Sequence, residues 1–394
     1  GPDLVGGDPE MRAAWFASTG VMWARMRDFR RAYDCLDRAR TLAPDDSWVL
    51  SLESAVHGLA DRWADALNSA ERAWVVDPGA PFAAAATGTS LLSLGRIEES
   101  AARLSVAADE SQSWELVLDA CWRQCALAET REGRERDSAL DRATRLADRL
   151  LLLAPLADRE SRSLLARARL DIAALSEDYI QIERWAEEVR SPFHRTLVAN
   201  LRKNTAGRRI RLPFQRTIQK HDTCLPASLS AAMSAGGLTV AVDDIATEVT
   251  FGGTPDWAAA AWLRDRAFHV RAFTVTSGLA IRLIHHRIAF VLFWDAEEGG
   301  HAVAVVGLDE RAGTLLVHDP SMLRTTEYLL TILDQRSSPL GFRGMAVVGQ
   351  DRSADLDALL PPDSAVVEAA QDYGRVLAAH GPSATVPIVA DVVE

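Results

Sequence analysis

A 34-residue period runs through the first 110 residues and constrains the fold of this chain more than any other feature. Phe29, Trp63 and Ile97 follow one another at 63 − 29 = 34 and 97 − 63 = 34 residues. The same interval separates the members of four further sets: Ala32, Ala66 and Ser100; Leu36, Ala70 and Leu104; Ala39, Ala73 and Ala107; and Pro44 and Pro78. A period of this length is typical of solenoids built from stacked supersecondary units.

Small residues at the predicted helix crossings and a proline just after each helical stretch make the repeating unit a helix-turn-helix pair. Residues 29–46 and 63–80 are predicted to contain the second helices of two such pairs. The pattern resembles the tetratricopeptide repeat. It is strong for residues 13–110 and continues more loosely through 114–200, so we predict tetratricopeptide-like repeats over 13–200.

The resemblance implies a concave surface of the kind that holds peptides or partner proteins. The alternative is that the repeats are only a rigid scaffold. Most of the tryptophans of this half, including Trp63 and Trp74, lie at helical spacing and are predicted to be core residues rather than binding residues.

Composition sets the outer limits. The chain has 394 residues, 48% of them hydrophobic and 25% charged, as in ordinary globular proteins. A net charge of −12 argues against nucleic acid or an anionic membrane as a partner. No run approaches the roughly 18 apolar residues of a membrane span, and no signal peptide is apparent. These features favour a cytoplasmic protein.

Two remaining features concern the cysteines and the start of the chain. Cys35, Cys121, Cys125 and Cys224 are scattered, which does not suggest a disulfide framework and suits a reducing compartment. The opening Gly-Pro resembles the remnant of a cleaved tag, so residues 1–12 are predicted to be tag remnant and leader.

Beyond residue 200 the composition shifts, and we predict a second domain over residues 201–350. Residues 201–212 are a linker that leads into its first strand. The predicted elements are helices within 243–266 on either side of a Gly-Gly-Thr-Pro turn, a helix at 279–287, and strands at 267–275, 288–294 and near 344. Helices followed by an antiparallel sheet indicate an α+β domain. Residues 351–394 are predicted to form one amphipathic helix and a frayed tail.

Cys224 is placed where a thiol is activated. It directly precedes a small-residue apolar run with Pro226 in its first turn, which predicts a helix whose N-terminus carries the cysteine. The helix macrodipole favours the thiolate there. Gln219 lies five residues earlier (224 − 219 = 5), within reach of a developing oxyanion. An isolated cysteine is more often a buried packing residue, so Cys224 alone decides little.

A downstream hairpin supplies what a cysteine nucleophile needs. His301 opens an apolar stretch predicted to be a strand, residues 309–313 form a turn, and 314–318 form the return strand, which Asp319 follows. Antiparallel pairing makes His301 and Asp319 neighbours. An imidazole backed by a carboxylate is the general base and its orienting group in cysteine-dependent acyl transfer.

Together these residues resemble the bacteriocin-processing cysteine peptidases, bacterial papain-fold domains that remove leader peptides after Gly-Gly. The separations, 301 − 224 = 77 and 319 − 301 = 18, are similar to those of that family, and the resemblance covers roughly residues 210–350. It implies Cys224 as nucleophile, His301 as base, Asp319 as orienter and Gln219 as oxyanion donor. The family usually has Gly after the cysteine; Leu225 stands there instead and is expected to narrow the cleft.

The other titratable residues give no second site. Cys121 and Cys125 have the i, i+4 spacing of two metal ligands on one helix face. No further ligands lie near them in the sequence, so we predict that both are packing residues. We assign His221 to a solvated loop and expect His318 to point away from Asp319. His285 and His286 face opposite sides of a helix. No cofactor or metal is predicted.

The predicted fold is therefore an all-α tetratricopeptide-like solenoid followed by an α+β papain-like cysteine peptidase domain. The predicted function is a cysteine peptidase that cleaves a peptide or protein substrate recruited by the repeats. Two alternatives stay open: a ligase, cyclase or crosslinking transferase that uses the same Cys-His-Asp site with an amine acceptor, and a catalytically silent peptide-binding module.

Overall fold

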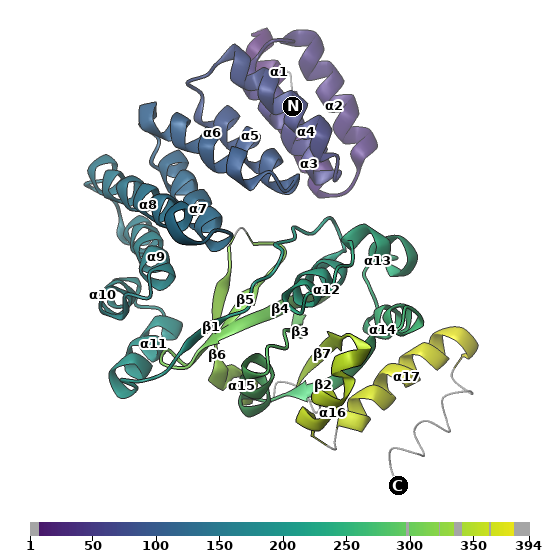
Figure 1. Cartoon of the computed structure of the whole chain (residues 1–394). Helices are drawn as coiled ribbons and strands as arrows, with labels where there is room; N and C mark the ends of the chain where they lie inside the picture. The colour runs from purple at the N-terminus through teal and green to yellow at the C-terminus, as the bar shows by residue number, and fades with distance from the viewer. Residues whose placement is uncertain (1–7, 297–298, 323, 335–340, 362–363, 382–394) are drawn as a thin grey trace. The chain divides into compact units, whose positions relative to one another are not determined.

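The structure is a computed structural model that describes residues 8–296, 299–322, 324–334, 341–361 and 364–381. It divides into two compact units, residues 1–189 and 190–394, called here the helical unit and the mixed unit (Figure 1). Each has its own buried core. The helical unit contains only helices, and the mixed unit combines helices with one antiparallel sheet, so the predicted fold class is confirmed.

The described part of the helical unit is a succession of helices that pack against their neighbours in sequence. They are α1 (Pro9–Arg25), α2 (Phe29–Leu42), α3 (Ser47–Leu59), α4 (Trp63–Val76), α5 (Pro81–Ser93), α6 (Ile97–Glu110), α7 (Trp114–Glu129), α8 (Gly133–Leu153), α9 (Arg159–Leu175) and α10 (Tyr179–Val189).

The 34-residue period reappears in the backbone. Helices α2, α4 and α6 begin 34 residues apart, and the turn before each holds one residue in the left-handed region: Arg27 at φ 62°, Asp61 at φ 58° and Gly95 at φ 75°. Small residues at equivalent positions are fully buried where the helices cross: Ala32, Ala66 and Ser100. The period therefore specifies both the turn and the helix contact of each repeat.

The limits of the repeat region differ from the sequence boundaries at both ends. Helix α1 begins at Pro9, earlier than the predicted start at residue 13. Helix α11 (Pro192–Lys203) groups with the mixed unit, where Asn200 Nδ2 donates a hydrogen bond to Ala312 O at 2.9 Å. Of the tag remnant and leader predicted over residues 1–12, residues 1–7 lie outside the described residues, and Pro9 already belongs to α1. The predicted frayed tail lies outside the described residues from 382 onward.

The mixed unit is built on a sheet of order β2-β7-β3-β4-β5-β6, with β1 also paired to β4, and every pair is antiparallel. The strands are β1 (Arg209–Arg211), β2 (His269–Val275), β3 (Phe290–Ala296), β4 (Gly299–Asp309), β5 (Thr314–His318), β6 (Thr326–Leu329) and β7 (Phe342–Val348). After α11 its helices are α12 (Cys224–Ala235), α13 (Val242–Val249), α14 (Asp256–Asp265), α15 (Ser277–His285), α16 (Ser353–Leu359) and α17 (Ser364–His380), with short 3₁₀ turns at Leu330–Asp334 and Gln350–Arg352.

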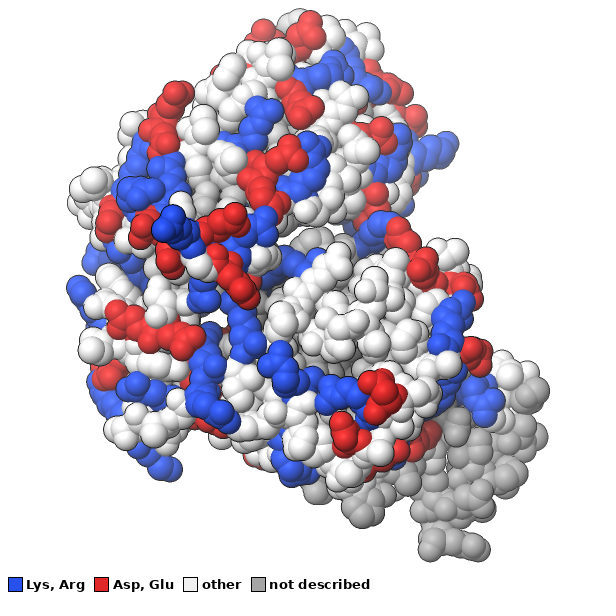
Figure 2. All heavy atoms as spheres, viewed as in Figure 1, with Lys and Arg blue, Asp and Glu red and all other residues white. Residues whose placement is uncertain are grey.

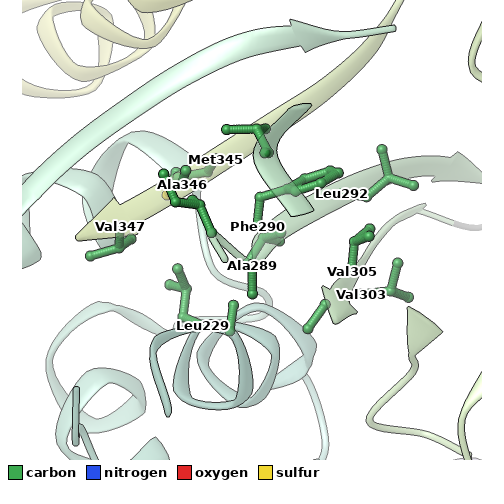
Figure 3. Packing of buried hydrophobic residues seen from close by; sticks show 14 of the residues in the cluster. Leu229, Ala289, Phe290, Leu292, Val303, Val305, Met345, Ala346 and Val347 are labelled. Atoms are coloured by element: carbon green, nitrogen blue, oxygen red, sulfur yellow. The ribbon is translucent and has the colours of Figure 1, made fainter. Parts of the chain in front are cut away.

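Helix α12 packs across the middle of this sheet and forms the centre of the core. Figure 3 shows Leu229 of α12 facing apolar side chains of the central strands: Ala289 and Phe290 at the start of β3, Val303 and Val305 of β4, and Met345, Ala346 and Val347 of β7. Burying a large aliphatic side chain of this kind contributes roughly 1.5–3 kcal/mol. Ser228 Oγ also donates to Ala302 O at 2.8 Å, which ties the helix to β4.

The last two helices belong to the mixed unit rather than to a separate tail. Helix α17 packs against β2 and α14, as Figure 1 shows in yellow. Arg271 of β2 pairs with both Asp357 of α16 and Glu368 of α17. The sequence predicted the α17 helix, but not these contacts, because they join residues almost a hundred positions apart.

Charged side chains of both signs are interspersed on the face of the chain drawn in Figure 2. On that face the net charge of −12 is not gathered into one acidic patch. The view therefore gives no sign of a single-sign electrostatic footprint there.

Gly307 provides a test of how β1 is held. A Cβ at this position would lie 2.3 Å from Ile210 O and 3.2 Å from Arg211 Cα, so β1 would have to move off β4. We expect Gly307→Ala to lower the free energy of unfolding by about 1–3 kcal/mol, the usual effect of overpacking. Urea titration followed by circular dichroism measures it.

The matched control for this substitution is Gly300→Ala on the same strand, where an added Cβ would meet nothing within 4 Å. It should leave the midpoint nearly unchanged. Equal midpoints for the two variants would contradict tight pairing of β1 with β4.

Candidate active site

The candidate nucleophile, Cys224, is the first residue of α12. Hydrogen bonds between Lys220 and Thr223 fix the loop before it. Lys220 N donates to Thr223 Oγ1 at 2.8 Å, and Thr223 Oγ1 donates to Lys220 O at 3.0 Å. Asp222 adopts φ 59°, the left-handed conformation that turns the chain into the helix. Backbone N–H groups in the first turn of a helix have no intrahelical acceptor, so they point toward the sulfur and the space beside it.

His301 reaches Cys224 from the sheet. It is the third residue of β4, opposite Trp294 on β3. Its Nε2 lies 2.9 Å from Asp319 Oδ1, and the ring lies near enough to the Cys224 thiol for the two groups to shift each other's pKa. Because Nε2 faces the carboxylate, Nδ1 is the nitrogen left for the sulfur.

The electrostatics favour a thiolate paired with an imidazolium. Burial opposes the charged thiol, but hydrogen bonds from His301 and from the Ala302 and Leu225 N–H groups outweigh it, so the pKa of Cys224 lies below its usual range. Hydrogen bonds to Asp319 and then to Cys224 raise the pKa of His301 to about 10. At neutral pH His301 is therefore protonated and Cys224 is drawn toward its anionic form.

Asp319 is held by a residue that the sequence analysis did not single out. Ser321 donates to Asp319 Oδ1 twice, from its backbone N–H at 2.9 Å and from its hydroxyl at 2.7 Å. Burial opposes ionisation of Asp319, but the hydrogen bonds from His301 and Ser321 keep its pKa below the usual range. The signal was present in the Asp-Pro-Ser sequence, since aspartate side chains commonly bond backbone N–H groups two residues ahead.

Gln219 lies next to this loop. Its backbone N–H donates to Pro320 O at 3.0 Å, directly after Asp319. Its Oε1 atom is buried and has no hydrogen-bond partner among the described residues. The structure thus brings Gln219 to the loop that carries Asp319, and its role as oxyanion donor stays a prediction.

The remaining candidates lie elsewhere. His318 is fully buried, with Nε2 2.9 Å from Thr217 O and its ring against Phe214. His221 is exposed beside Asp222, and His285 contacts Glu310. Both cysteines of the predicted packing pair are buried in the core of the helical unit.

A cavity of about 510 Å³ opens at the Cys224–His301 pair. Its lining is partly aromatic and contains three glycines: Asp222, Cys224, Leu225, Phe251, Gly252, Gly253, Thr254, Pro255, Asp256, Phe293, Trp294, Gly300, His301, Ala302 and Arg343. Leu225 is only 2% exposed and packs into the core, so it offers little surface to a ligand. That its side chain narrows the cleft stays a prediction.

The model of the Peptidase_C39 like family matches residues 209–335. No curated protein matches the chain. The family match ends before β7, α16 and α17, which complete the mixed unit.

Two solved structures are similar to parts of the chain. PilF of Pseudomonas aeruginosa is 14% identical over 48% of this chain and 82% of its own, with a TM-score of 0.37. The peptidase domain of Streptococcus ComA, a bi-functional ABC transporter involved in quorum sensing, is 14% identical over 35% of this chain and 98% of its own, with a TM-score of 0.28. The prediction of a cysteine-peptidase-like domain preceded by a helical region is confirmed by the family match and by the helices that come before it.

None of the described helices is long and apolar enough to cross a membrane. Within the same part of the chain, no group of three or more His, Cys, Asp or Glu side chains is arranged to hold a metal ion.

Selective labelling tests the activation of Cys224. Its depressed pKa means that Cys224 keeps its reactivity toward iodoacetamide at lower pH than an ordinary thiol does, and loses it as the pH falls through the pKa of the thiol. Burial raises the pKa of Cys35, and Cys121 and Cys125 are buried, so these three should label more slowly. Peptide mapping by mass spectrometry gives the four rates, and faster labelling of any other cysteine near pH 6 would contradict the assignment.

Ser321→Ala tests the support behind His301. Loss of the hydroxyl donor should raise the pKa of Asp319 toward its ordinary value and loosen its hold on His301. One hydrogen bond is worth about 1 kcal/mol, so labelling of Cys224 near pH 6 should slow roughly fivefold and its pH profile should shift upward.

Ser353→Ala is the control for this variant, because that hydroxyl bonds only Gln350 O at the start of α16. It should label like the wild type. If the pH profile of Cys224 labelling in Ser321→Ala superimposes on that of Ser353→Ala, Ser321 does not position Asp319.

Proposed function

We propose that this chain is a cysteine peptidase that cleaves a peptide or protein substrate. The observation that carries the proposal is that Cys224 and His301 line one cavity, with Asp319 hydrogen-bonded behind His301 at 2.9 Å. A nucleophile, a base and an orienting carboxylate in one line are the parts that acyl transfer from a peptide requires. The match to the Peptidase_C39 like family supports the same reaction class.

The proposed reaction begins from the ion pair. The Cys224 thiolate attacks the carbonyl carbon of the scissile peptide bond, and the negative charge moves onto the carbonyl oxygen. The Cys224 N–H at the head of α12, together with the Gln219 side-chain amide, stabilises that oxyanion. His301 then gives its proton to the leaving amine as the carbon–nitrogen bond breaks, which leaves a thioester on Cys224.

The second half regenerates the enzyme. Neutral His301 takes a proton from water, and the hydroxide attacks the thioester carbon. The sulfur leaves as thiolate, a carboxylic acid product departs, and Asp319 again faces an imidazolium. An amine in place of water gives a new amide bond, so the identity of the acceptor distinguishes a peptidase from a ligase.

Mass spectrometry of peptide mixtures incubated with the chain in heavy-oxygen water tests the reaction. We expect new C-termini that carry heavy oxygen with the wild type and none with Cys224→Ser. His301→Ala should lower the rate by roughly three orders of magnitude or more, and Asp319→Asn by less, since the base stays in place. Wild-type rates in a correctly folded His301→Ala chain would rule out His301, and new amide linkages without heavy oxygen would favour the transferase.

We further propose that the helical unit recruits the substrate. Trp48 of α3 and Phe82 of α5 occupy the same repeat position (82 − 48 = 34), and their rings meet edge to face at 4.9 Å. Trp48 remains 41% exposed. Exposed aromatic side chains are frequent anchors of peptide interfaces, and a remote anchor raises the local concentration of the scissile segment.

Trp48→Ala tests recruitment in the intact chain. We expect a higher KM for a long native-length substrate and no change for a short fluorogenic peptide, because only the long one reaches the repeats. Val106→Ala, an exposed apolar side chain on α6, is the control. If Trp48→Ala and the control give the same KM for the long substrate, this anchor plays no part in recruitment.

A further inference from the structure

Arg343 meets the candidate active site from outside the segment that matches the family. It lies on β7 and lines the same cavity as Cys224 and His301. Its guanidinium stands 5.4 Å from the centroid of the Phe293 ring, and its Nη1 donates to Asp256 Oδ2 at 2.8 Å. The side chain of Arg343 is 34% exposed and that of Asp256 is 16% exposed, so a ligand in the cavity meets the cation more than its partner.

Asp256 holds the Arg343 guanidinium, and the Asp256 carboxylate also accepts hydrogen bonds from two other donors. Its Oδ1 accepts the N–H of Trp257 at 2.8 Å at the start of α14, where the helix macrodipole favours negative charge. Its Oδ2 accepts Nε2 of Gln371 at 3.4 Å as well as Arg343. Three donors therefore share the Asp256 carboxylate, which holds the Arg343 guanidinium in one place.

Gln371 belongs to α17, which packs against α14 beside the Asp256 carboxylate. Gly374, one turn further along, lies so close to Trp257 that a Cβ would stand 3.0 Å from the indole. Asp222, a second carboxylate among the described residues that line the cavity, lies 3.2 Å from the neighbouring His221 imidazole. Of the described residues that line the cavity, Arg343 is the one arginine or lysine.

We propose that Arg343 is a specificity-determining residue that binds a carboxylate of the peptide a few residues from the scissile bond. Asp256 and Gln371 are its positioning residues. A planar guanidinium clamped on one side by a carboxylate and on one face by an aromatic ring is preorganised for such recognition. The inference rests on the proposed function for its substrate, and it assigns the C-terminal helix a role in substrate choice.

Alkylation of Cys224 by iodoacetyl peptides tests this without requiring turnover, so failure of the peptidase proposal and failure of this one are distinguishable. One arm compares iodoacetyl peptide amides that carry Glu or Gln after zero, one or two Gly residues. A second arm compares iodoacetyl-Gly-Gly with a free or an amidated C-terminus. The first arm reports an acidic side chain, and the second reports a terminal carboxylate.

In the full chain we expect the best-placed carboxylate probe to react roughly tenfold faster than its neutral partner, the gain of one charge-assisted hydrogen bond. Arg343→Gln should reduce that ratio to about one while reaction with the neutral probe is kept. Gln371→Ala should give an intermediate ratio. The matched control is Arg266→Gln, because Arg266 also pairs with a carboxylate, Glu248, and stacks on an aromatic ring, Trp262, but lines a different cavity.

A ratio near one in both arms for the wild type overturns the proposal, and so does an unchanged ratio in Arg343→Gln. Arg343→Lys is the second variant, in case Arg343→Gln fails to fold. It keeps the positive charge but loses the planar, bidentate guanidinium. It should retain part of the preference. A preference in Arg343→Lys equal to that of the wild type would show that charge alone, rather than bidentate recognition, selects the ligand, and would overturn the proposed mode of binding.

Discussion

The packing of α12 across the centre of the sheet is the contact on which the candidate site depends. Leu229 anchors the helix on β3, β4 and β7, and Ser228 fixes it to Ala302 of β4. The backbone of the same residue, Ala302, also helps to lower the pKa of the Cys224 thiol. Helix and strand are therefore in register at the position where thiol and imidazole must meet, and a shift of the helix along the sheet would separate nucleophile from base.

Charge organises the site once the backbone has placed it. Each group in the line depends on the next: Ser321 keeps Asp319 ionised, Asp319 keeps His301 protonated, and His301 draws Cys224 toward the thiolate. Burial disfavours the charged form of each of these groups, and the hydrogen bonds to its partner offset that cost. The removal of one member is therefore expected to affect all the others, so these residues act as a unit rather than as independent contributions.

Local sequence signals predicted the core of this arrangement. Cys224 before an apolar run, and His301 and Asp319 at the open end of one hairpin, are features of contiguous segments, and the 34-residue period belongs to the helical unit alone. What the sequence did not reveal depends on pairing between distant segments. Arg343 reaches the cavity because β7 inserts between β2 and β3, and α17 reaches Asp256 only after the sheet is complete. The burial of Leu225 was missed for the same reason, since its environment is set by the strands beneath α12.

The ultraviolet absorbance of the thiolate, measured as the difference between wild type and Cys224→Ser across pH, tests the ion pair most directly. We expect the thiolate of Cys224 to form at a pH well below the ordinary thiol pKa of about 8.5, and its titration to shift to higher pH in His301→Ala. A thiolate that appears only in the ordinary range, and at the same pH with and without the imidazole, would contradict the account.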